Sequence, residues 1–308
     1  MMINNILRRL LHAAIVLTGV VLLIFVMLRI VPGNPIETMM GEHADQAAIA
    51  RMTAEMGLDR PIHVQFFQYL LSAVRGDFGT SISLGKPVSE LLRDAFGNTV
   101  RLAVFAAVFA WITGIGCGIL CAVKKNRLPD RLFMGFSLMG ISLPVFMTAM
   151  LLQYLFAFRL DWFPISGSGS WRSFILPAIA LGWNSAGQVA QMTRTTLLET
   201  LQEDYIDTAR AKGRGQAGVL LRHALRNAML PVVTLMAIQF SSLLSGAVIT
   251  ETIFAINGVG SLMVQGITGR DIPLLQATAL LATGLVILGN FLADCLYAAL
   301  DPRIRKEG

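Results

Sequence analysis

The stretch from Gln202 to Pro231 reads QEDYIDTARAKGRGQAGVLLRHALRNAMLP. Its apolar residues recur at helical spacing on both sides of Gly213, which predicts two short amphipathic helices hinged at Gly213–Gly215. Arg210 and Lys212 suit the last turn of the first helix, and Gly213 suits its stop. A disordered basic anchor would not need this periodicity. We therefore expect a folded basic loop whose first helix offers a free apolar face to a groove in another protein.

Hydrophobic runs dominate the rest of the chain. Of its 308 residues, 55% are hydrophobic and only 14% are charged, against about a quarter in a soluble domain. A helix needs roughly 20 residues to cross a bilayer, and backbone groups in lipid must be satisfied within the segment. The sequence thus predicts an all-α membrane protein with six transmembrane helices. They fall in the uncharged runs Leu10–Leu28, Leu102–Val123, Leu132–Phe158, Ser173–Thr193, Asn227–Thr250 and Ile272–Ala293.

The distribution of Lys and Arg predicts the orientation. One set of short connections holds 15 of the 25 basic residues, including those of the loop 194–226. By the positive-inside rule, both termini are then cytoplasmic and residues 31–98 lie outside. The chain divides into a first helix with its N-terminus (1–30), an extracytoplasmic segment (31–98), a five-helix core (99–300) and a cytoplasmic tail (301–308). The net charge of +6 follows from this topology and does not indicate nucleic acid.

The extracytoplasmic segment is too small to hold an independent core. Pro61–Val74 has the spacing of an amphipathic helix, so we expect a small helical cap on the membrane face. In the second span, Gly114 and Gly118 form a small-xxx-small pattern that predicts close packing against another helix.

Prolines and neutral amides interrupt the apolar spans. Pro144, Pro177 and Pro231 predict kinks in the third, fourth and fifth spans, because proline removes a backbone donor. Polar side chains also lie within these spans: Gln153, Asn184, Gln188, Gln191 and Gln239. They form either a path for a polar solute or a set of interhelical hydrogen bonds. We favour a path lined by Asn184 and Gln188.

The sequence argues against an enzyme and against a metal site. The segment Gly79–Pro87 has the wrong spacing for a phosphate-binding loop, and Pro87 replaces the Ser or Thr that binds magnesium. No histidine falls in a later span, so no nucleophile–base pair can be assembled there. Cys117 with Cys121, and the separate His43 and His63, form no cluster of metal ligands. No span carries an acid or histidine near its centre, which weakens proton-coupled transport.

Two motifs in the basic loop resemble the coupling loop of ABC-importer permeases, specifically the dipeptide/oligopeptide/nickel family. They are EDYIDTARAKG at 203–213 and HALRNAMLPV at 223–232. Further similar motifs extend over nearly the whole chain: PGNP at 32–35, GLDRP at 57–61, DFGTS at 77–81, GISLP at 140–144, ETIF at 251–254, GVG at 258–260, Arg270-Asp271 and LDPR at 300–303. The sequence departs from the family pattern at Asn34, Gln191, Asp207 and Asn257.

The resemblance implies a pore subunit of an ATP-driven importer in the bacterial inner membrane. It implies a second homologous permease subunit, two cytoplasmic ATPase subunits that bind ATP and Mg²⁺, an extracytoplasmic solute-binding protein, and no cofactor in this chain. The residues implied in ATPase coupling are Glu203, Tyr205, Thr208, Ala209, Arg210, Ala211, Lys212 and Gly213. We expect a di- or oligopeptide as the solute, with nickel, a metal chelate or glutathione as alternatives. A stand-alone secondary transporter is the alternative from a different class.

Overall fold

A computed structural model describes residues 2–30, 47, 51, 53–54, 57, 59–213, 215–245 and 247–300. Among these residues every regular secondary-structure element is a helix, and a single isolated antiparallel bridge joins Thr80 to Pro87. The all-α prediction is confirmed. The 301–308 tail, most of the segment 31–60, Asn34 and His43 lie outside the described residues. Contacts divide the chain into two units, Met1–Thr99 with Ile256–Leu285, and Val100–Ala255 with Val286–Gly308.

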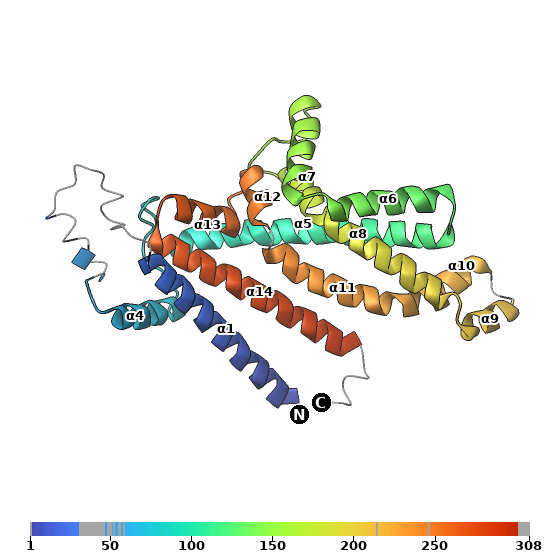
Figure 1. The fold of residues 1–308 in the computed structure, drawn as a ribbon, viewed down its shortest axis with the longest axis horizontal. Coiled ribbons are helices and arrows are strands. Elements are labelled where there is room, and N and C mark those ends of the chain that lie inside the picture. Colours follow the sequence, from blue (N-terminus) through green and yellow to red (C-terminus); the bar gives the residue numbers. More distant parts are fainter. Residues whose placement is uncertain are drawn as a thin grey trace. The chain divides into compact units, whose positions relative to one another are not determined.

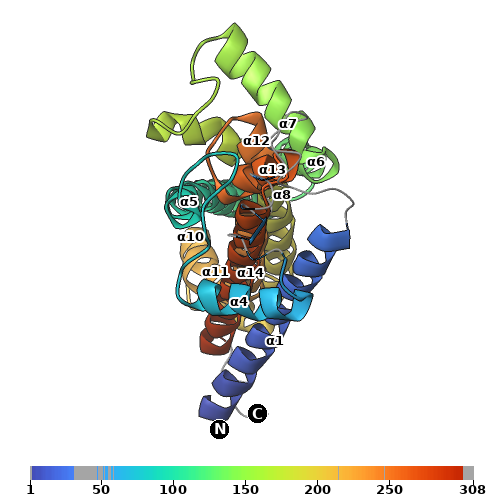
Figure 2. The same cartoon turned by 90° about the vertical axis from the view of Figure 1, so that its left-hand side faces the viewer.

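The first unit contains the predicted extracytoplasmic helix. Its helices are α1 (Met2–Ile30), α4 (Ile62–Val74), the beginning of α5 (Val88–Val123), α13 (Val259–Thr268) and the first half of α14 (Ile272–Leu300). Figure 2 shows α4 beside α1, where the rings of Phe25 and Phe66 meet edge to face with centroids 5.3 Å apart. Val88 and Leu92 of α5 pack with Leu274 and Ala277 of α14 in a buried cluster.

A buried carboxylate fixes the loop before α5 in this unit. Asp271 is fully buried and accepts hydrogen bonds from the Oγ of Ser81 at 2.6 Å and the Oγ of Ser83 at 2.8 Å. The backbone N–H of Ser83 donates to the same oxygen at 3.0 Å. The other carboxylate oxygen accepts from the N–H of Leu274 in the first turn of α14. The side chain thereby joins the loop to the start of α14.

The second unit is built around α8 (Ile175–Thr200), which packs against α6, α7 and α11. Figure 1 shows its course. The other elements are α6 (Leu128–Ser142), α7 (Val145–Leu152), the π-helix η1 (Gln153–Arg159), the 3-10 helix η2 (Trp171–Phe174), α9 (Asp204–Ala211), α10 (Gln216–Val219), the π-helix η3 (Leu220–Ala224), α11 (Leu225–Ser245) and α12 (Val248–Ile253).

Glycines let α8 approach its neighbours closely. A Cβ atom added to Gly118 of α5 would lie 2.6 Å from the Cβ of Thr193, and one added to Gly114 would lie 2.7 Å from the Cβ of Val189. Neither position can accept a side chain without a shift of the helices. The close packing predicted for Gly114 and Gly118 is therefore confirmed.

Among the described residues, three helices are long and apolar enough to cross a membrane: Val88–Val123, Gln216–Leu244 and Ile272–Ala293. The bent pair Leu128–Ser142 and Val145–Arg159 makes a fourth if it forms one span. The count of six spans stays a prediction. Helix α5 has 36 residues and is about 54 Å long, so it is longer than the roughly 30 Å core of a bilayer.

The third predicted span is not one kinked helix. Helix α6 ends at Ser142, α7 begins at Val145, and the two axes differ by 110°. Proline has no N–H to continue the helix, and it disfavours the helical conformation in the preceding residue. Leu143 is accordingly extended, with φ −78° and ψ 132°. Pro144 is where the span breaks, as expected, but it starts a separate helix.

The other two prolines differ from each other. Pro177 is the third residue of α8, which follows η2 directly, and the N–H of Ile175 donates to the carbonyl of Arg172. A kink at Pro177 stays a prediction. Pro231 lies inside α11, where it leaves the carbonyl four residues earlier without a helical donor. A kink at Pro231 stays a prediction.

Candidate functional site

The first short helix of the basic loop forms as α9. Glu203 precedes it in an extended conformation. Asp204 and Asp207 lie in its first turn, where the negative charge of an acidic side chain interacts favourably with the helix dipole. Gly213 ends it with φ +76°, a left-handed conformation that glycine adopts without a steric penalty. The N–H of Gly213 donates to the carbonyl of Arg210 at 2.9 Å. The predicted helix and its glycine stop are found.

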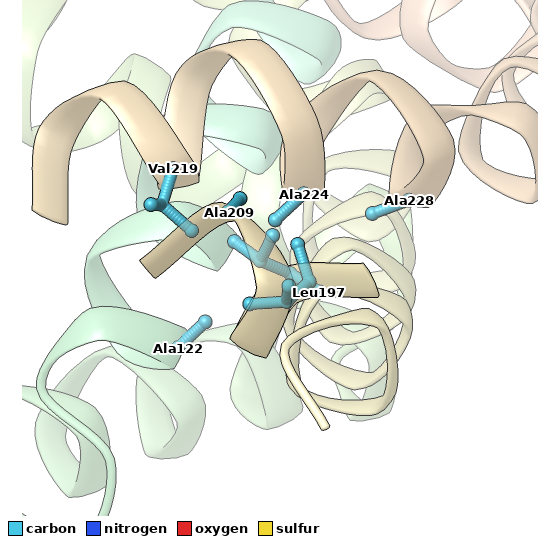
Figure 3. Close-up of a cluster of buried hydrophobic side chains, with 7 residues drawn as sticks. Ala122, Leu197, Ala209, Val219, Ala224 and Ala228 are labelled. Atoms are coloured by element: carbon cyan, nitrogen blue, oxygen red, sulfur yellow. The ribbon is translucent and has the colours of Figure 1, made fainter. Parts of the chain in front are cut away.

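The apolar face of α9 is already covered by the chain itself. Ile206 is fully buried and Ala209 nearly so. They share a cluster with Ala122 at the end of α5, Leu197 of α8, Val219, Ala224 and Ala228 (Figure 3). The expectation of a free apolar face that docks in a partner groove is therefore wrong. Periodicity showed which face of the helix is apolar, but the tertiary fold decides what covers it.

The second predicted short helix is not a separate element. After Gly215, the chain runs through α10 and η3 into α11, and residues 216–244 form one helical span. Between α9 and this span the structure describes Lys212, Gly213 and Gly215. The helix that contains the predicted fifth span therefore begins directly after Gly215, and its first turn contributes Val219 to the cluster that buries Ile206.

The opposite face of α9 is polar and exposed. Of the eight residues implied in coupling, Ala209 points into the cluster and the other seven are exposed: Glu203, Tyr205, Thr208, Arg210, Ala211, Lys212 and Gly213. The hydroxyl of Tyr205 accepts a hydrogen bond from Nδ2 of Asn227 on α11 at 2.8 Å, which orients the ring. The α9 helix thus combines a buried apolar side with an outward polar side that a protein partner can contact.

The residues that depart from the family pattern have ordinary surroundings where they are described. Asp207 pairs with Arg210 on the exposed face, with Oδ1 and Nη1 2.8 Å apart. The carbonyl of Asn257 accepts from Nδ2 of Asn98 at 2.9 Å. Gln191 is half-buried on α8.

Asp130 and Arg194 form an ion pair that sequence reasoning missed. Nε of Arg194 lies 2.7 Å from Oδ1 of Asp130, and Nη2 lies 2.8 Å from Oδ2. The Asp130 side chain is only 4% exposed. The available signal was an acid in the first turn of a helix that follows a run of basic residues, but nothing in the sequence indicates its partner 64 residues away.

The amides predicted for a solute path bond to one another and to the backbone. Nδ2 of Asn184 donates to the carbonyl of Ile141 at 3.2 Å, and Oδ1 accepts from Nε2 of Gln188 at 2.7 Å. Nε2 of Gln239 on α11 donates to Oε1 of Gln188 and to the carbonyl of Ser185. The network joins α6, α8 and α11.

The Asn184 bond has a local cause. Carbonyls in the last turn of a helix have no helical donor, and the break at Pro144 leaves Ile141 in that turn. Gln153 acts similarly on the other side of the break, where Nε2 donates to the carbonyls of Ile165 and Ile253 at 2.9 and 3.1 Å. In this conformation the geometry favours the interhelical role, and a path-lining role stays a prediction.

A cavity of about 540 Å³ lies between α5, α6, η1 and α8. Its wall is mostly aromatic and aliphatic, with Phe109, Phe136, Trp162 and Trp183 among the lining residues. None of the five amides considered for the solute path lines it. The described residues contain no group of three His, Cys, Asp or Glu side chains that could hold a metal ion.

Comparison with known proteins identifies the family. Residues 114–306 match the family model of the binding-protein-dependent transport system inner membrane component, and residues 2–103 match the model of its N-terminal region. The chain belongs to this family. It is a permease subunit of an ABC importer, and ATP is hydrolysed by other subunits, as predicted.

Curated relatives match the chain from end to end. The glutathione transport system permease protein GsiC of Salmonella paratyphi A is 42% identical over 306 residues, which cover 99% of this chain and all of the relative. GsiC of Escherichia coli K12 is 41% identical over the same coverage. Members of the family are inner-membrane proteins, and they act together with an ATPase and a solute-binding protein.

Two solved structures share the fold. The MetNI methionine ABC transporter in an inward-facing conformation has a TM-score of 0.58 at 19% identity, covering 68% of this chain and 96% of that one. The crystal structure of an amino acid ABC transporter with histidines has a TM-score of 0.56 at 15% identity, covering 68% and 94%.

Proposed function

We propose that this permease subunit imports short peptides of the glutathione class across the bacterial inner membrane. Glutathione is itself a modified tripeptide, so it falls within the peptide class that the sequence motifs resemble. The observation that carries the proposal is the end-to-end match to permeases of glutathione transport systems at 42% identity. Nickel or a metal chelate is the alternative within the same architecture.

The proposed assembly contains a second homologous permease subunit and two ATPase subunits, with a solute-binding protein outside. Both termini are then cytoplasmic and residues 31–98 are extracytoplasmic. The 15 basic residues gathered in one set of connections support this orientation. ATP and Mg²⁺ are bound by the ATPase subunits, and this chain carries no cofactor.

Helix α9 is the proposed ATPase contact. Its exposed side presents Tyr205, Thr208 and Lys212, while Ile206 and Ala209 anchor it to α5, α8 and α11 through the buried cluster. A helix held in this way transmits a displacement to the spans beneath it. When the ATPases close on ATP, we expect α9 to move with them. The bent α6–α7 pair then opens the translocation path to the outside, as alternating access requires.

Reconstitution of the complete complex tests the solute class. Proteoliposomes that contain both permease subunits and the ATPases, with the binding protein added, are supplied with labelled glutathione, a labelled dipeptide or labelled nickel. We expect ATP-dependent uptake of glutathione, with unlabelled short peptides as competitors. Uptake of nickel without uptake of either peptide would contradict the proposed solute.

A further inference from the structure

Asp130 and Arg194 lie close in sequence to two residues, Ala122 and Leu197, that bury the apolar face of α9. Asp130 is in the first turn of α6, after the turn that follows α5, and Arg194 is one helical turn before Leu197 on α8. Ala122 at the end of α5 and Leu197 belong to the buried cluster that covers Ile206. The ion pair therefore joins α8 to the start of α6 and, through the Asn126 N–H, to the α5–α6 connection, next in the chain to the two residues that bury Ile206.

The geometry of the pair is specific. Two parallel hydrogen bonds at 2.7 and 2.8 Å join the guanidinium to both carboxylate oxygens. Oδ2 also accepts from the backbone N–H of Asn126 at 2.8 Å, and Asn126 has φ +61°. Such a two-pronged bond fixes both distance and orientation, which a single point charge does not.

The choice of partner is also informative. Lys124, Lys125, Arg127 and Arg131 stand within six residues of Asp130, and all four are exposed. Asp130 nevertheless pairs with Arg194, whose side chain is 24% exposed, and it does so while being 4% exposed itself. A surface pair would be screened and weak, whereas a buried pair that loses one partner leaves an uncompensated charge.

We propose that Asp130 and Arg194 are positioning residues that help to couple ATP hydrolysis to transport. Their ion pair holds the α5–α6 connection against α8, so that both move together with α9. This inference rests on the proposed role of α9 as the ATPase contact. Without the ion pair, ATP hydrolysis continues, but α8 and the α5–α6 connection no longer move together, so part of each displacement of α9 is not transmitted. The quantity that changes is the number of solute molecules transported per ATP hydrolysed.

The test measures this coupling ratio in the reconstituted complex for three variants. Asp130→Asn removes the charge, and Arg194→Lys keeps the charge but loses the two-pronged bond. The double variant Asp130→Leu with Arg194→Met replaces the pair by apolar groups, a change that buried pairs often tolerate without loss of stability. Arg131→Gln is the matched control, because it removes an exposed charge one residue away.

We expect the three variants to lower the coupling ratio by on the order of five- to tenfold, in the range of typical coupling between sites, and the control to leave it unchanged. A role in stability alone lowers uptake and ATPase activity together, with the amount of complex, and leaves the ratio unchanged. An unchanged ratio in the double variant would overturn the proposal. Cross-linking of Thr208→Cys to the ATPase is measured in each variant. An unchanged coupling ratio with a normal cross-link contradicts the role of the ion pair, whereas loss of the cross-link contradicts the assignment of α9 as the ATPase contact.

Discussion

Gly118 of α5 lies against Thr193 of α8 so closely that a Cβ on the glycine would be 2.6 Å from the Cβ of the threonine. The carbonyl oxygen of Ala190 would be almost as close, at 2.7 Å. Backbone atoms of one helix thus occupy the space that a side chain on the other would need. Thr193 is one residue before Arg194, so this contact sets the separation of α5 and α8 where the ion pair forms.

Gly118→Ala should therefore destabilise the permease. We expect a loss of about 1–3 kcal/mol, the usual cost of overpacking a well-packed core. Thermal denaturation of the detergent-solubilised complex measures it. Gly116→Ala on the same helix is the control, because a Cβ there meets nothing within 4 Å. Equal melting temperatures for the two variants would contradict the close packing.

Gly213→Leu should uncouple transport while the protein still inserts and binds the ATPase. A Cβ at Gly213 meets no neighbour within 4 Å, so the cost comes from the left-handed φ of +76° and is about 1–2 kcal/mol. Gly213→Asn should retain more activity, because asparagine tolerates this conformation better. Uptake and ATPase pull-down are measured for both. Wild-type uptake by Gly213→Leu would argue against a requirement for this helix stop.

Asn184→Leu distinguishes the two roles of the amide network. If the network holds helices together, the variant loses its bonds to Ile141 and Gln188, which are worth about 0.6 kcal/mol each, and the yield of intact complex falls. If Asn184 lines the path, uptake falls while the yield is unchanged. We expect the first result, with Gln239→Leu behaving in the same way because it also bonds to Gln188.

Asp271→Asn should loosen the loop that precedes α5. The carboxylate accepts from Ser81 and from two donors of Ser83, and hydrogen bonds to a charged group contribute about 1.5–3 kcal/mol. We expect faster proteolytic cleavage within residues 77–87 when protease is added to intact spheroplasts. Asp94→Asn, at an exposed position on α5, should leave the cleavage rate unchanged.

Local signals predicted α9 and its end well, because caps, charges near helix ends and glycine act within a few residues. Pro144 marked the break in the third span for the same reason, but the angle of 110° depends on how α7 packs against α8 and α12. The sequence indicated that Ile206 and Ala209 share an apolar face. It did not indicate that Ala122 covers that face, nor that Asp130 pairs with Arg194, because these contacts join parts of the chain that are distant in sequence.

The most direct test of the account is a cross-link from α9 to the ATPase. With the three native cysteines replaced by alanine, a single cysteine at Thr208 is treated with a bifunctional maleimide in membranes that contain the assembled complex. We predict an adduct with an ATPase subunit, because Thr208 is exposed on the polar side of α9. A cysteine at Ile112, exposed on the apolar part of α5, should give none. No adduct at Thr208, or equal adducts at both positions, would contradict the assignment of α9 as the coupling helix.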